Sequence, residues 1–194
     1  MQQQEFSPQD SLNLIESMIN KARNRFSENG HLYLLWGWVI LICSIVSFIS
    51  LYRFKDFRLY PVWFLTWVAV IYQFIYIFRK KKEQTVRTYT DEINANVWMV
   101  FVIMGGLMGV ILSKMGHYQL MNTMVLILYG MPTFLSGVIF KFNPLKFGAV
   151  ICWVLAYIST LIPYEFSFLL LSMAVVTAWI VPGYLLRSRY KNQN

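Results

Sequence analysis

Two histidines and two cysteines are the side chains best suited to metal or nucleophilic chemistry in this chain of 194 residues. His31 stands at the start of the first apolar stretch and His117 lies in the loop after the third, so the two imidazoles cannot share a metal. Cys43 lies near the middle of the first stretch, and Cys152 about one helical turn into the fifth. Their depths differ by roughly 10 Å, more than a disulfide allows. We therefore expect two small, buried core residues.

Three loop residues form a second set of candidates for metal chemistry. Asp56, His117 and Glu165 come from three loops on the same predicted side of the molecule, and together they could bind a divalent cation if those loops converge. The simpler interpretation is three solvated loop residues. Walker, G-x-S-x-G, C-x-x-C and H-E-x-x-H motifs are all absent from the sequence. The sequence therefore predicts no metal, no cofactor and no catalytic residue.

The most polar patch within the apolar stretches combines an amide with hydroxyl groups. Its members are Tyr72, Gln73 and Tyr76 in the second stretch and Thr133 and Ser136 in the fourth. Such a patch could line a small-molecule pocket. The alternative, which we favour, is hydrogen bonding between helices, worth about 0.6 kcal/mol per bond on average.

Apolar residues dominate the elements that must position these side chains. The chain is 57% hydrophobic and 13% charged, against roughly 25% charged residues in soluble domains. Six windows contain no Asp, Glu, Lys or Arg, and each is about the 20 residues that a bilayer-spanning helix needs. Unlike the alternating strands of a membrane barrel, they are apolar on all sides. The predicted fold is all-α, a bundle of six transmembrane helices over 32–186. The predicted spans are 32–52, 59–78, 93–113, 118–140, 147–164 and 166–186.

Small residues and prolines mark where these helices should approach one another or bend. Small residues four positions apart allow close helix contact in lipid, and a proline inside a helix kinks it. The positions concerned are Gly105 with Gly109, Ala174 with Ala178, Pro132, and Pro182-Gly183.

Lysine and arginine predict the orientation of the bundle, because both are enriched in cytoplasmic loops. If successive segments alternate sides, 13 of the 17 Lys and Arg residues share a side with both chain ends. We therefore predict that segment 1–31 and tail 187–194 are cytoplasmic. The net charge of +8 follows from this bias and favours anionic lipid headgroups as partners. Without a soluble basic domain we expect no nucleic acid binding.

Two features outside the spans are suited to a surface or a partner. Residues 7–26 predict an amphipathic helix that lies in the membrane interface, or pairs with a partner protein or a second copy. Its apolar stripe is Leu12, Ile15, Ile19, Ala22 and Phe26. A basic run after the second span predicts a lipid-headgroup anchor. This anchor is Arg79, Lys80, Lys81 and Lys82.

Six short motifs also occur in a recognisable order. They are Glu28-Asn29-Gly30, Leu34-Leu35-Trp36-Gly37-Trp38, Tyr129-Gly130-Met131-Pro132-Thr133-Phe134-Leu135-Ser136-Gly137, Lys141-Phe142-Asn143-Pro144-Leu145, Ile151-Cys152-Trp153 and Val181-Pro182-Gly183-Tyr184-Leu185-Leu186. Together they resemble an uncharacterised family of small, six-span bacterial inner-membrane proteins, from about residue 12 onward. The resemblance implies a bacterial membrane origin and six helices, and it carries no activity or site residue.

Two functions fit these predictions. The charge-free interior beside an amphipathic helix and a basic loop favours a non-enzymatic sensor, regulatory or scaffolding subunit that acts through its cytoplasmic surface. The alternative is a small channel or transporter for a neutral or lipid-like substrate, because charged residues, the usual mark of ion pathways, are absent from the spans. An enzyme acting on lipid would need a nucleophile and a base at one interface, and the sequence offers no such pair.

Overall fold

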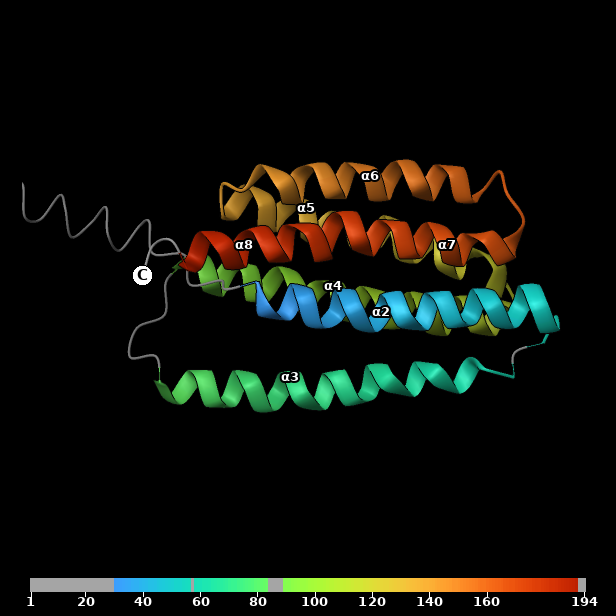
Figure 1. Cartoon of the computed structure of the whole chain (residues 1–194), viewed down its shortest axis with the longest axis horizontal. Coiled ribbons are helices and arrows are strands. Elements are labelled where there is room, and N and C mark those ends of the chain that lie inside the picture. The colour runs from blue at the N-terminus through green and yellow to red at the C-terminus, as the bar shows by residue number, and fades with distance from the viewer. Residues whose placement is uncertain (1–29, 57, 84–88, 192–194) are drawn as a thin grey trace, which may run out of the picture.

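The computed structural model describes residues 30–56, 58–83 and 89–191, which are almost entirely helical and contain no strand. Six helical segments run side by side in alternating directions (Figure 1), so that the start of the first and the end of the last lie at the same end of the bundle. In chain order the elements are α2 (His31–Ile49) with the π-helical turn η1 (Ser50–Phe54), the 3-10 turn η2 (Tyr60–Trp63) with α3 (Phe64–Glu83), α4 (Tyr89–Met115), η3 (Tyr118–Leu120) with α5 (Met121–Ile139), α6 (Asn143–Ser159), and α7 (Tyr164–Val175) with the π-helical turn η4 (Val176–Ile180) and α8 (Val181–Lys191).

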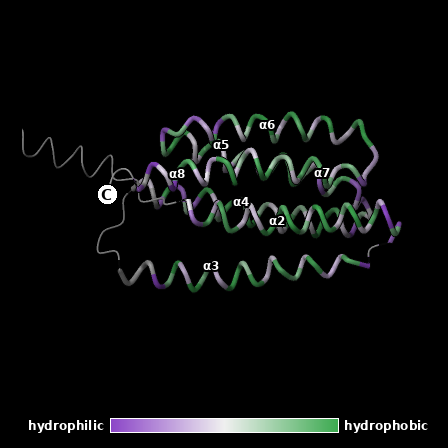
Figure 2. The backbone as a smooth tube through the Cα atoms, viewed as in Figure 1, coloured by the Kyte–Doolittle hydropathy of each residue, from purple (hydrophilic) through white to green (hydrophobic). Residues whose placement is uncertain are grey.

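Five of the six predicted spans coincide with helices that are long and apolar enough to cross a bilayer. These are His31–Phe54, Tyr60–Arg79, Glu92–Met115, Tyr118–Ile139 and Tyr164–Arg189. Apolar residues fill their middles, and hydrophilic residues gather toward the ends and loops (Figure 2). The buried residues in the described part of the chain include no Asp, Glu, Lys or Arg. The absence of charge from the interior is therefore confirmed for those residues.

The predicted bounds 147–164 for the fifth span are wrong. The helix there is α6, which begins at Asn143 and ends at Ser159. Pro144 occupies the first turn, where its missing N–H costs no hydrogen bond, and Pro163 cannot continue a helix. The predicted span began at 147 because the charge-free window starts after Lys146. A lysine near a helix end can lie within the span, because its long side chain extends the ammonium group to the interface. With 17 residues, α6 is about 26 Å long, near the lower limit for a span.

A widened turn interrupts the last helical segment at the position that Pro182 predicts. In η4 the backbone N–H of Val181 donates to the carbonyl of Val176, five residues earlier. Pro182 has no N–H to offer the carbonyl of Ala178, and its ring collides with a regular preceding turn, so the turn opens into π geometry. The other predicted irregularity differs, since α5 continues as α-helix through Pro132.

Two glycines bring neighbouring helices against this widened turn. A Cβ added to Gly148 of α6 would lie 2.5 Å from Ala178 Cα, and one added to Gly37 of α2 would lie 2.6 Å from the Ile180 side chain. Ala174 and Ala178, the predicted small-residue pair, are both buried. The core of the bundle is therefore set by backbone-close packing of α2 and α6 on η4.

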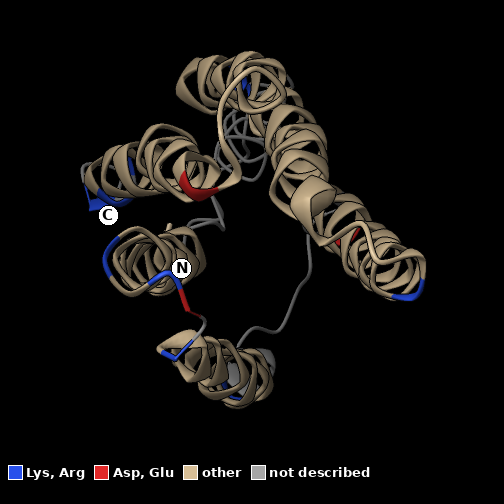
Figure 3. Ribbon diagram, turned by 90° about the vertical axis from the view of Figure 1, so that its right-hand side faces the viewer, with Lys and Arg blue, Asp and Glu red and all other residues tan. Residues whose placement is uncertain are grey.

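The close approach predicted for Gly105 and Gly109 is not found. No heavy atom lies within 4 Å of a Cβ built on either of them. Helix α4 packs along one face against α5, and Leu112 is its one buried residue among those whose burial is described. Among the residues of α3 whose burial is described, Ala69 is likewise the one that is buried, and α3 packs on α2. Seen end-on (Figure 3), α3 at the bottom and α4 at the right stand apart from each other. The glycine pattern gives α4 the capacity for close contact, and the described chain supplies no partner there.

Replacing Gly148 tests this packing. Gly148→Ala should lower the free energy of unfolding by about 1–3 kcal/mol, because the new methyl group meets backbone that has no room to move. Gly109→Ala places the same group in open space and should leave stability unchanged or raise it by up to about 1 kcal/mol, because alanine favours a helix more than glycine does. Reversible unfolding in bicelles, followed by circular dichroism, measures both variants. Equal losses would contradict the packing described.

Candidate functional site

The five residues of the predicted polar patch divide between two places in the structure. Tyr72, Gln73 and Tyr76 lie on α3 and contact His31 and Trp36 of α2. Thr133 and Ser136 lie on α5, inside the bundle, where both are fully buried. Because each group has its own partners, the structure does not combine the five residues in one pocket.

The first group joins the middle of α3 to the start of α2. His31 Nε2 lies 2.9 Å from the Tyr72 hydroxyl, and Trp36 Nε1 donates to Gln73 Oε1. The ring of Tyr76 packs against His31 with 4.9 Å between centroids. These contacts fit the hydrogen-bonding interpretation of the patch, and they add His31 and Trp36 to it.

Three further hydrogen bonds continue this junction to the far end of α2. Trp63 Nε1 donates to Ser47 Oγ at 2.9 Å, and Ser50 Oγ donates to the Asp56 carbonyl at 2.7 Å. The Cys43 thiol lies 3.5 Å from the Val62 carbonyl. Since α3 and η2 bury little apolar surface, side-chain hydrogen bonds carry much of their attachment to α2.

The second group belongs to a central polar–aromatic cluster. We use that name for Tyr33, Asn94, Trp98, Phe101, Tyr129, Thr133, Ser136 and Trp179. Trp179 Nε1 donates to Thr133 Oγ1 at 3.0 Å, which ties the widened turn η4 to α5. Ser136 Oγ donates to Asn94 Oδ1 at 2.6 Å, which ties α5 to α4.

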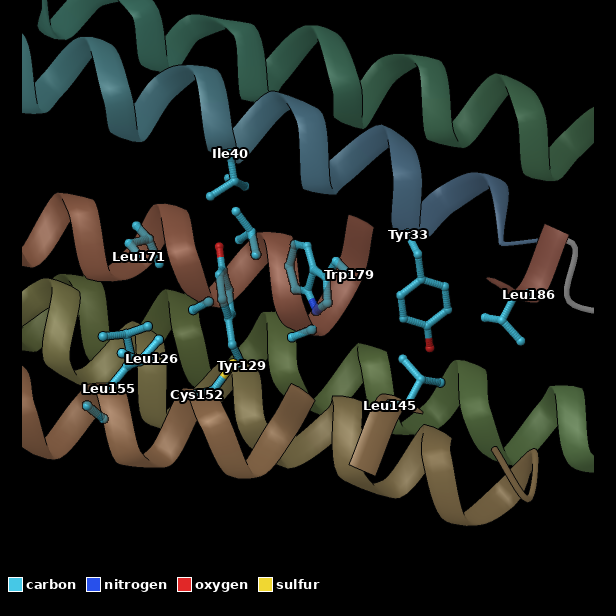
Figure 4. Packing of buried hydrophobic residues seen from close by; sticks show 14 of the residues in the cluster. Tyr33, Ile40, Leu126, Tyr129, Leu145, Cys152, Leu155, Leu171, Trp179 and Leu186 are labelled. Atoms are coloured by element: carbon cyan, nitrogen blue, oxygen red, sulfur yellow. The ribbon is translucent and has the colours of Figure 1, made fainter. Parts of the chain in front are cut away.

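Aromatic rings fill the space between those two hydrogen bonds. The Tyr129 and Trp179 rings lie 4.5 Å apart, side by side in the middle of the core (Figure 4). Phe101 and Trp98 bring α4 into the cluster, at 5.6 Å from Tyr129 and 5.8 Å from Trp179 respectively. Tyr33 extends it to α2, at 5.9 Å from Trp98. Four helical segments therefore meet around one set of rings.

Sequence reasoning missed several polar side chains that hold this bundle together. Asn94 was not singled out, nor were Asn122, Thr123 and Ser167 at the opposite end of α5. There Asn122 Nδ2 donates to Ser167 Oγ at 2.7 Å, and the Thr123 and Ser159 hydroxyls lie 2.7 Å apart. The available signal was an amide inside a charge-free window, because such a group needs a partner within the protein.

The loop residues considered for a metal do not come together. Within the described chain no three His, Cys, Asp or Glu side chains are placed to hold a metal ion. Asp56 and His117 are exposed, and Glu165 is half-buried. The cation-site hypothesis is therefore wrong for these residues. Cys43 and Cys152 are buried free thiols, as expected for core residues.

Two predicted surface features fall wholly or partly outside the described residues. The amphipathic helix 7–26, with Leu12, Ile15, Ile19, Ala22 and Phe26, lies outside them. So do the side chains of Lys80, Lys81 and Lys82, whose backbone belongs to α3. Arg79 is described, and it is exposed.

Comparison with protein-family models, curated proteins and solved structures finds no match. The chemistry of the site is therefore argued from its own residues. The hydroxyl, indole and amide groups of these residues hydrogen-bond to one another, and these pairs within the described chain include no nucleophile bonded to a base. The arrangement is suited to holding helices together.

A double-mutant cycle tests whether the bond between Trp179 and Thr133 stabilises the bundle. Thr133→Val keeps the size of the side chain and removes the acceptor, while Trp179→Phe removes the donor together with part of the buried ring system; the cycle cancels the cost of that lost volume. We expect a coupling energy of about 0.6–1.7 kcal/mol, the range for such bonds in membrane proteins. Unfolding in bicelles provides the four free energies.

The control replaces Thr160 in place of Thr133. Its hydroxyl is exposed and donates to the Tyr157 carbonyl of its own helix, so Thr160→Val should combine additively with Trp179→Phe, within about 0.5 kcal/mol. The same coupling in both cycles would show that the buried bond has no specific role.

Proposed function

We propose that this chain is a multi-pass membrane protein that acts without catalysis, as a sensor, regulatory or scaffolding subunit. The observation that carries the proposal is how the interior uses its polar groups. Most of the buried polar side chains in the described residues hydrogen-bond to another helix, and none of the buried residues there is charged. A proton or ion pathway would call for ionisable groups there. In this proposal the protein therefore acts through contacts that its outer surfaces make with other molecules.

The acting surface in this proposal is the end of the bundle where α2 begins and α8 ends. We assign it to the cytoplasmic side of a bacterial inner membrane, on the bias of Lys and Arg toward that side. Arg189 lies 6.0 Å from the Phe142 ring centroid, which links α8 to the turn between α5 and α6. That link supports a continuous surface across helices that are distant in sequence.

Two kinds of partner fit this end. Anionic lipid headgroups suit the basic run Arg79–Lys82, each residue contributing about 1 kcal/mol near a charged surface. A protein partner, or a second copy of the chain, suits the apolar stripe of helix 7–26.

The second candidate function is a channel or transporter for a neutral or lipid-like substrate. It is favoured by one observation, the open space beside the glycines of α4, with α3 standing apart from it. A substrate dissolved in the bilayer could approach the backbone of α4 at these glycines. Substrate-dependent flux into proteoliposomes would favour this function over the first.

Photocrosslinking in native membranes tests the partner surface. A photoreactive residue at Ile15 or Ile19 should give a discrete adduct, because both lie on the apolar stripe. The same group at Asn13 or Asn20, off the stripe, is the matched control and should give little. The size of the adduct distinguishes a second copy from another protein. Equal yields from the stripe and the control, or no adduct from either, would contradict the proposal.

A further inference from the structure

We draw no further inference here: the strongest candidate, the exposed apolar surface that α3 and α4 present on the open side of the bundle, carries none because nothing in the described part of the chain shows what covers it.

Discussion

Hydrocarbon offers no hydrogen-bond partner, and this one constraint shapes the rest of the molecule. Backbone groups are satisfied within helices, so the variable part is how polar side chains find one another. Here they do so across helix boundaries: Asn122 with Ser167, Ser136 with Asn94, Trp179 with Thr133. Each bond is weak by the standard of a soluble core. Together they fix which helices are neighbours, because a mismatched pair would leave donors and acceptors buried without partners.

Packing divides the bundle into a close-set core and two lightly attached helices. Gly148 and Gly37 let α6 and α2 approach the widened turn η4, and the aromatic cluster fills the space beside it. By contrast, α3 is tied to α2 largely through hydrogen bonds, and α4 to α5 along a single face. This division gives the bundle a closely packed centre and a more open side along α3 and α4. The second candidate function follows from that open side.

The helices were predictable because a charge in hydrocarbon costs several kcal/mol, which leaves long charge-free windows in the sequence. The ends of the helices were harder to predict, as α6 demonstrates. The charge-free window begins after Lys146, whereas the helix begins at Asn143, next to Pro144, and ends at Ser159, before Pro163. For the polar residues within the spans, the sequence predicted that each needs a hydrogen-bond partner, but it did not predict which residue that partner is. The sequence grouped Gln73 with Thr133 in one possible polar patch, whereas in the structure Trp36 donates to Gln73 and Trp179 donates to Thr133. The same holds for Gly105 and Gly109, whose spacing permits a close contact without saying whether the chain itself provides it.

The central claim is that all six helical segments, the short α6 included, cross one bilayer in alternating directions. Single cysteines, introduced where Cys43 and Cys152 have been replaced by Ala, can be tested with an impermeant maleimide on sealed vesicles of known orientation. The decisive positions are Lys141 and Thr160, which flank α6, with Ser188 in α8 as the reference. The account predicts that positions 141 and 188 react from one side and position 160 from the other. Reaction of 141 and 160 from the same side would mean that α6 does not cross, and would contradict it.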